Sequence, residues 1–106
     1  MIVMPSPAPH QAVFDAIADP TRRDILAVLI ERPAGVEEIA ARFPISRPAI
    51  SRHLKLLLRA GLVARRESGR TNIYRIEPEP LEAVRDWMNE IWRGRLALLK
   101  RIAEGD

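Results

Sequence analysis

The chain has 106 residues, of which 47% are apolar and 29% are charged, a balance that suits a single soluble domain with a modest core. No uninterrupted apolar run is long enough to span a bilayer, which argues against a membrane protein. The chain contains no cysteine, which excludes disulfides, thiolate metal sites and cysteine nucleophiles and favours a cytoplasmic protein.

The N-terminal stretch differs in composition from the rest of the chain. It holds three prolines within five positions and lacks the basic start of a secretory signal. We therefore expect residues 1–9 to be a short flexible leader and residues 10–106 to form one domain.

The net charge of +3 is distributed unevenly along the chain. Residues 46–75 carry eight basic side chains and one acidic side chain, whereas the segments before and after this block each have a net charge of −2. A basic block between mildly acidic segments is typical of a fold that meets a polyanion with only one of its surfaces. A solvated basic face is the alternative interpretation.

Helical spacing predicts three helices before the basic block. The first covers residues 10–18. The second begins at Asp19 and Pro20, a capping residue followed by a first-turn proline, and ends at Pro33. Its apolar stripe consists of Ile25, Leu26, Leu29 and Ile30. The third helix covers residues 35–43.

The basic block opens with a fourth helix, predicted over residues 46–60. Ser46 is a good N-cap, Pro48 is tolerated in the first turn, and Gly61 ends the helix. The apolar residues recur at helical spacing and form one face, which consists of Ile50, Leu54, Leu57 and Leu58. The basic and hydroxyl side chains of this helix therefore face elsewhere.

Two β-prone runs, residues 62–66 and 71–76, flank a polar turn that contains Ser68 and Gly69. This pattern predicts a β-hairpin. One long last helix is expected over about residues 79–103, because its positions step by threes and fours in the a/d pattern of packed helices. These positions are Leu81, Val84, Met88, Ile91, Arg95, Leu98 and Ile102.

Two short helices joined by a tight turn, the second with a basic and hydroxyl-rich N-terminal half, form the reading unit of helix-turn-helix DNA-binding proteins. We therefore expect a mainly α-helical winged helix-turn-helix fold, with helix 46–60 in the major groove of double-stranded DNA. Arg47, Ser51 and Arg52 are expected at base edges. The hairpin would be a wing, with residues 65–71 on an adjacent groove or the backbone. The full set of expected DNA contacts is Ser46, Arg47, Pro48, Ser51, Arg52, His53, Lys55, Arg65, Arg66, Arg70, Thr71 and Tyr74.

Two members of this set have alternative interpretations. Tyr74 also fits a half-buried strand residue, and His53 lies either at the edge of the DNA surface or packed near the wing. His53 and Ser51 do not indicate catalysis, because side chains two positions apart on a helix point to different sides and no acid completes a triad. The chain also lacks a Gly-rich phosphate loop and a carboxylate constellation, so we expect no enzyme.

Three segments carry a resemblance to a known family. FDAIADPTRRDILAVL, VEEIAARFPISRPAISRHLKLLLRAGLV and RRESGRTNIYRI resemble the ArsR-type winged-helix repressors, particularly their cysteine-free members, over about residues 12–104. The resemblance implies a symmetric homodimer that binds a palindromic operator and represses transcription. It also implies a dimer interface formed by the first and last helices, which here would contain Val13, Phe14, Ile17, Trp87, Ile91, Leu98 and Ile102.

The sequence departs from the metal-sensing branch of that family. Those members bind metal through a cysteine-containing motif on the third helix, or through His and acidic pairs on the last helix. Here the third helix reads VEEIAARF, the last helix has no His, and His10 and His53 are too scattered for a convincing site. We therefore expect no metal and no cofactor, and the sequence does not identify a small-molecule effector.

Other interpretations stay open beside the repressor. A winged-helix module that binds an acidic protein would also carry a basic surface. A metal- or ligand-gated sensor would share the same DNA-binding head. Trp87, Met88 and Trp92 fit a dimer interface or a small-molecule pocket, and the acidic pair Asp86 and Glu90 fits a solvated helical face or a cation site.

Overall fold

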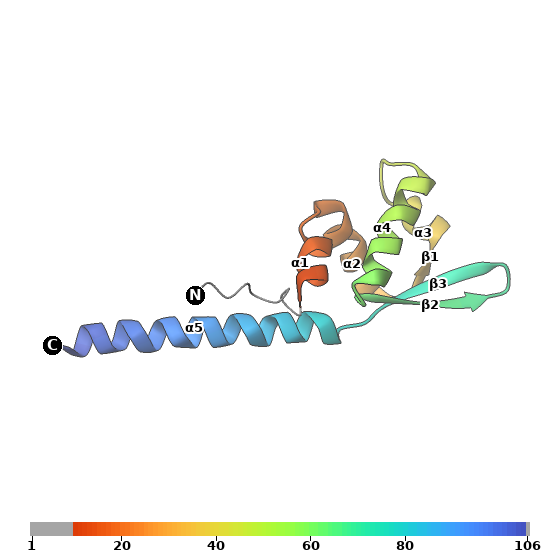
Figure 1. The fold of residues 1–106 in the computed structure, drawn as a ribbon. Coiled ribbons are helices and arrows are strands. Elements are labelled where there is room, and N and C mark those ends of the chain that lie inside the picture. The colour runs from red at the N-terminus through yellow and green to blue at the C-terminus, as the bar shows by residue number, and fades with distance from the viewer. Residues whose placement is uncertain (1–9, 106) are drawn as a thin grey trace, which may run out of the picture.

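The computed structural model describes residues 10–105, so the expected leader at residues 1–9 lies outside the described residues. This part folds into a small head and one long helix that extends away from it (Figure 1). The elements in chain order are α1 (Gln11–Ile17), α2 (Pro20–Glu31), β1 (Ala34–Gly35), α3 (Val36–Ala40), α4 (Arg47–Arg59), β2 (Val63–Ser68), β3 (Thr71–Ile76) and α5 (Glu79–Gly105). The prediction of a mainly helical fold with a small β wing is confirmed.

Two helices begin at the caps that the sequence predicts. The Asp19 carboxylate accepts a hydrogen bond from the backbone N–H of Arg22 at 3.0 Å, so it caps α2. The Ser46 hydroxyl accepts one from the N–H of Ala49 at 3.2 Å, so it caps α4. These bonds satisfy backbone donors that have no partner within the helix.

The end of α4 is shaped by Gly61, which has a φ of 74°. Its N–H donates to the carbonyl of Leu58, and the N–H of Leu62 donates to the carbonyl of Leu57, both at 3.0 Å. This pair of bonds is the Schellman motif. Leu57 and Leu62, whose side chains accompany the motif, are fully buried. The motif directs the chain from α4 into β2.

Two details of the predicted helices are wrong. The third helix ends at Ala40 rather than residue 43, because the N–H groups of Arg42 and Phe43 donate to carbonyls three residues back and tighten the chain into a turn. Ile30 is 68% exposed. One step beyond Leu29 rotates the side chain by about 100° around the helix, which carries it off the buried stripe.

The sheet has three antiparallel strands in the order β1-β3-β2. The hairpin register runs from Val63 opposite Ile76 to Ser68 opposite Thr71, as expected for the wing. The sequence did not predict β1, because two residues carry no readable alternation. Gly35 suits this strand, since a Cβ there would lie 3.4 Å from the backbone oxygen of Asn72.

The core lies where α1–α4 meet the base of the sheet. Its largest fully buried side chains are Ile25, Leu29, Ile39, Ile50, Leu54, Leu57 and Leu62. Val84, in the second turn of α5, is the last residue along the chain that joins this cluster. The head therefore completes a hydrophobic core within one chain.

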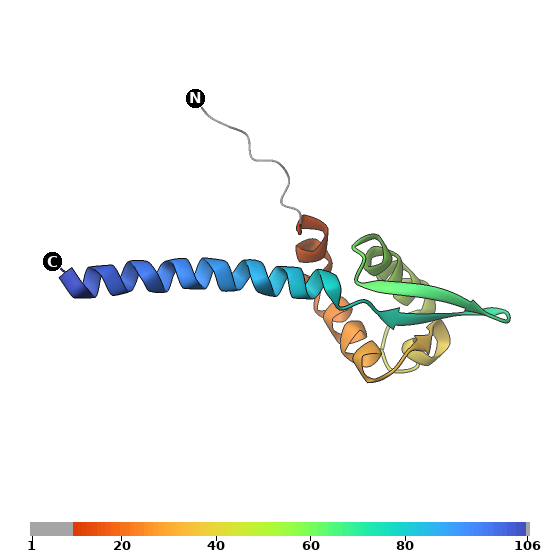
Figure 2. The ribbon, with the colours of Figure 1, turned by 90° about the horizontal axis from the view of Figure 1, so that it is seen from below.

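Beyond Val84, α5 leaves the head as a single straight helix (Figure 2). The radius of gyration is 18.5 Å, whereas a compact chain of this length has about 13 Å. Among residues 10–105, no helix is both long and apolar enough to cross a membrane.

Candidate nucleic-acid interface

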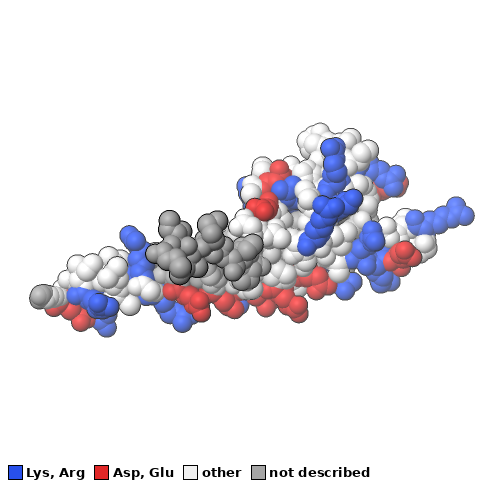
Figure 3. Space-filling view, viewed as in Figure 1, with Lys and Arg blue, Asp and Glu red and all other residues white. Residues whose placement is uncertain are grey.

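Helix α4 has a core face and an outer face. Ile50, Leu54 and Leu57 are fully buried on the core face. Arg52 and Lys55 are exposed on the other side of the helix, as the 3.6-residue period requires. Figure 3 shows Lys and Arg side chains gathered over α4 and further ones along the wing, so the basic block of the sequence lies at the surface of this part of the head.

Most of these cationic side chains are free to meet a ligand. Within residues 10–105, no carboxylate lies within 4.0 Å of Arg52, Lys55, Arg59, Arg65, Arg66 or Arg70. Arg47 is an exception, since its Nη1 lies 3.2 Å from the Glu37 carboxylate. Both partners are mostly exposed, and such a pair contributes only about 0–1 kcal/mol, so a phosphate can replace Glu37.

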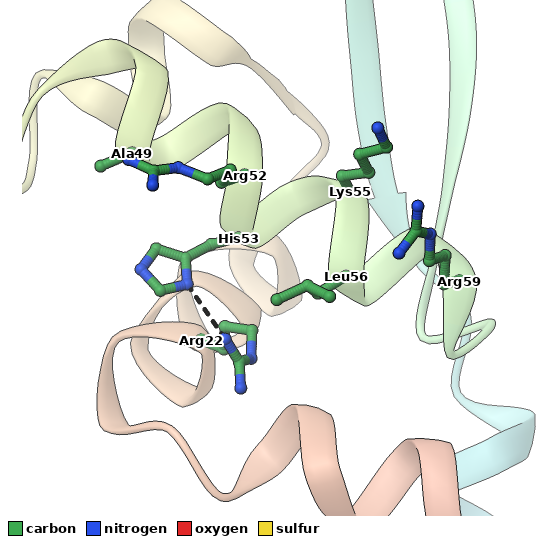
Figure 4. A pocket seen from close by; sticks show the side chains of 7 residues that line it. All are labelled: Arg22, Ala49, Arg52, His53, Lys55, Leu56 and Arg59. Carbon is green, nitrogen blue, oxygen red and sulfur yellow. Dashed lines mark hydrogen bonds between the residues drawn. The ribbon is translucent and has the colours of Figure 1, made fainter.

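Two hollows flank the outer face of α4. The open one, about 560 Å³, is lined by Arg47, Pro48, Ser51, Arg52 and Lys55, all of them predicted DNA contacts. The second, about 440 Å³, lies between α2 and α4 and is lined by Arg22, Ala49, Arg52, His53, Lys55, Leu56 and Arg59 (Figure 4). In Figure 4, Lys55 and Arg59 point away from α2, whereas His53 and Arg22 point toward each other.

His53 is therefore packed against the start of α2. Its Nδ1 lies 3.3 Å from Arg22 Nη1 and 4.0 Å from the Asp19 carboxylate. Its side chain is 21% exposed. The expectation that His53 packs near the wing is wrong, and a contact of His53 with DNA stays a prediction.

The wing places its hydroxyl residues inside the protein or in the turn. Tyr74 is 6% exposed, because it lies in the central strand between Ala34 and Arg65 and belongs to the core. Its assignment as a phosphate contact is corrected. The Thr71 hydroxyl donates to the carbonyl of Ser68 at 3.0 Å and closes the turn at the wing tip.

The wing arginines are exposed but do not share one face. Arg65 and Arg66 are neighbours on β2, and successive side chains of a strand point to opposite sides. Only one of them can therefore face a given DNA groove. Arg70 follows Gly69 at the tip, where the positive φ of 65° makes the tight turn that the sequence predicts.

Comparison with known proteins supports this geometry. A helix-turn-helix domain model matches residues 17–66. The transcriptional regulator Rv2034 of Mycobacterium tuberculosis is 39% identical over 95 residues, which cover 88% of this chain and 89% of the relative. The repressor SdpR of Bacillus subtilis is 38% identical over 76 residues, covering 72% and 84%. An ArsR-like regulator from Rhodococcus sp. RHA1 superposes with a TM-score of 0.77 at 38% identity, covering 88% of each chain.

The chain belongs to the ArsR family of transcriptional regulators. As an ArsR-family protein it is a DNA-binding transcriptional regulator rather than an enzyme, which confirms this part of the predicted function and the resemblance from which it was partly argued. Within residues 10–105 of this ArsR-family chain, no group of three or more His, Asp or Glu side chains lies close enough to hold a metal ion.

The residues that the resemblance assigns to a dimer interface divide into two sets. Val13 is 5% exposed and packs in the core of its own chain, so it offers almost no surface to a partner, and its assignment is corrected. Phe14 and Trp87 contact each other within the chain, with ring centroids 5.3 Å apart and planes at 66°. This edge-to-face pair fixes α1 against the start of the stalk, which is the part of α5 that extends beyond Val84.

Of the remaining interface residues, Ile17 lies on α1 and is half-buried against the core, whereas Ile91, Leu98 and Ile102 are exposed on α5. Eight of the eleven exposed large apolar side chains of the described chain lie on this helix: Trp87, Met88, Ile91, Trp92, Leu96, Leu98, Leu99 and Ile102. A soluble monomer rarely exposes a continuous apolar stripe of this kind. The ArsR-family chain thus presents a basic surface on its head and an apolar surface on its stalk.

Sequence analysis left Arg59 and Arg22, which line the hollow between α2 and α4, out of the expected DNA-binding site. Arg59 lies seven residues after Arg52, two helical turns along the same outer face, and this spacing was the available signal. Arg22 is far from α4 in sequence, and only the fold brings it to His53. No local pattern predicts that contact.

Proposed function

We propose that this ArsR-family regulator represses transcription by binding a palindromic operator as a homodimer in the cytoplasm. The observation that carries the proposal is the outer face of α4, whose exposed cations Arg52, Lys55 and Arg59 have no carboxylate partner among the described residues. A helix with such a face fits the major groove, where its N-terminal half reads bases.

The two sides of α4 would meet the two DNA strands that border the groove. Arg47 and Ser51, beside the open hollow, reach base edges together with Arg52. Arg70, at the wing tip, contacts a phosphate on that side, and Arg59 contacts the strand on the side of α2. Each neutralised phosphate releases counterions, so affinity falls steeply with salt.

A second copy would cover the apolar stripe of α5. Burial of Ile91, Leu98 and Ile102 against a partner removes the largest apolar surface of the chain from water. The relative SdpR is named a repressor, which supports the direction of regulation proposed here. Two copies of α4 related by a two-fold axis would then read two half-sites about one helical turn apart.

Selection of the purified protein on random duplexes over several rounds, with binding measured against salt, tests this proposal. Enrichment of an inverted repeat bound by two protomers is the expected result. Weak, salt-sensitive binding without sequence preference would contradict it and would favour a module that binds an acidic protein. Repression itself is tested with a reporter behind the selected site, where activation in place of repression would overturn the proposed direction.

A further inference from the structure

The guanidinium of Arg22 connects three helices. Its Nε donates to the carbonyl of Ala16 at 2.7 Å and its Nη2 to the carbonyl of Asp15 at 3.0 Å, both at the C-terminal end of α1. Its Nη1 lies 3.3 Å from Nδ1 of His53 on α4, which Figure 4 marks with a dashed line. Arg22 itself belongs to the first turn of α2.

The N–H groups of Arg22 determine which partner donates and which accepts in its contact with His53. A guanidinium has five N–H donors and no acceptor, so Nδ1 of His53 must accept the hydrogen bond. This hydrogen bond therefore requires the tautomer of His53 that carries its proton on Nε2. Because the guanidinium is planar and rigid, its fork fixes the directions of all three bonds, which a single ammonium cannot do.

We propose that Arg22 is a positioning residue that holds the recognition helix α4 at a set place relative to α1. Phe14 of α1 contacts Trp87 of α5, so α1 in turn is fixed to the stalk that the proposed dimer uses. Arg22 then adds a polar link, beside the packing of the shared core, to the path from the two-fold axis to each recognition helix. The inference rests on the proposed dimer. It states that Arg22 helps to set the separation between two DNA half-sites at which the dimer binds best.

The hydrogen bonds of Arg22 distinguish this role from a contact with DNA phosphate. Two of its nitrogens are held by carbonyls of α1 and the third faces His53. Arg52 and Arg59 line the same hollow with no carboxylate within 4.0 Å among residues 10–105. A phosphate on this side of α4 would therefore be held by Arg59, and Arg52 is left to reach a base edge.

Arg23 offers a matched control. Its Nη1 donates to the carbonyls of Ile17 at 2.7 Å and Ala18 at 3.1 Å, so it also caps the end of α1. No hydrogen bond or ion pair joins Arg23 to α4 in the described part of the chain. Arg22→Lys and Arg23→Lys both keep the charge, but only Arg22→Lys removes the fork that reaches the recognition helix.

The experiment compares the affinity of full-length protein for inverted repeats whose half-site separation changes one base pair at a time. Wild type and Arg23→Lys should prefer one separation, and Arg22→Lys should lower that preference roughly tenfold, within the usual range of coupling between two sites. Binding to an isolated half-site should stay unchanged. His53→Leu, which leaves the bonds from Arg22 to α1 in place, should also flatten the profile when each affinity is divided by that variant's own affinity for the half-site, even if Arg22→Lys fails to fold.

Two results would overturn the inference. Arg22→Lys and His53→Leu with the spacing profile of wild type would show that the fork does not set the separation. Equal loss of affinity at every separation and at the half-site would show that Arg22 acts through general stability or through phosphate. Wild type without preference for any inverted repeat would instead contradict the proposed operator itself, so the two failures are distinguishable.

Discussion

The apolar side chains of the head are mostly buried, whereas those of the stalk are exposed. In the head, Ile25, Ile50 and Leu54 are fully buried, and the residues that bury them come from the same chain. On the stalk, every described residue from 85 to 104 is exposed, including Ile91 at 53% and Ile102 at 68%. The head is complete as a monomer, whereas the stalk has the pattern of a packed helix without the partner that would pack on it.

The two regions also differ in the surface that they offer to solvent. The head carries the unpaired cations of α4 and the wing, which suit a polyanion. The solvent side of the stalk carries Glu79, Glu82, Asp86 and Glu90 in its first half, and Figure 3 shows acidic side chains along this edge. One chain therefore separates a basic surface on its head from the apolar surface that the proposed dimer would bury.

Charge placed on the apolar stripe should have the largest effect. Ile91→Glu combined with Leu98→Glu should convert the dimer to a monomer, because two carboxylates would be buried in the interface. Affinity for the inverted repeat should fall about 10²–10⁴-fold, the contribution of a linked second site. Sedimentation equilibrium and binding to fluorescent duplexes measure both changes.

The control places the same charge on the opposite side of α5. Ala97→Glu lies on the solvent side of the helix, about 120° from Ile91 and about 100° from Leu98. It should keep the dimer and its affinity. A dimer that survives the double substitution would place the interface elsewhere.

The core of the head provides the next largest effect. Leu54→Ala should lower the free energy of unfolding by about 2–5 kcal/mol, because it leaves a cavity beside fully buried neighbours. Leu98→Ala on the stalk should change the dimer dissociation constant more than the stability of the head. Urea unfolding at several protein concentrations separates the two effects, and the same concentration dependence for both variants would break the contrast between head and stalk.

Substitution of Arg52 and of Arg70 should affect DNA binding differently, because the first is proposed to contact a base and the second a phosphate. Arg52→Ala should weaken binding to the selected operator by about 1–3 kcal/mol if its side chain meets a base. Arg70→Ala, at the wing tip, should weaken binding to all sequences alike and lower the slope of log affinity against log salt by about 1. Equal losses on operator and random DNA for both variants would contradict the division between base reading and backbone contact.

The sequence predicted those features that depend on local periodicity. The caps at Asp19 and Ser46, the apolar face of α4 and the hairpin all follow from residues close together in the chain. The spacing of residues predicted a DNA-binding helix-turn-helix fold, and the resemblance to the ArsR family added the prediction of a transcriptional regulator. The basic surface was predictable because its residues lie in one continuous block.

The features that sequence reasoning missed depend on contacts between distant segments. β1 exists because Ala34 and Gly35 pair with β3 about 40 residues later, and two residues are too few for a pattern. Tyr74 is buried because it lies in the central strand of that sheet. The contact between Arg22 and His53 spans 31 positions, so it had no local signal.

The smallest effect concerns the cap that begins α2. The backbone N–H of Arg22 donates to the Asp19 carboxylate and holds its pKa below the ordinary value of 3.8, and the positive charge of Arg22 acts in the same direction. The ionised carboxylate therefore stabilises the fold above pH 3.8, and this contribution is lost as the pH falls through the lowered pKa.

Asp19→Asn keeps a capping oxygen but does not titrate. The melting temperature of wild type relative to Asp19→Asn should stay constant above about pH 5 and fall as the pH drops below about 4. A difference that grows at low pH would contradict the direction of the pKa shift. The comparison belongs to the head, because Asp19 lies in its first helical connection.

The division between a DNA-binding head and a dimerising stalk is tested most directly by the number of protomers bound to one duplex. Native mass spectrometry and titration on the selected site should give two protomers per duplex. Replacement of one half-site by random sequence should lower the affinity about 10²-fold or more, since the second head loses its contacts. One protomer bound with the same affinity to the intact and to the half-replaced duplex would contradict the account.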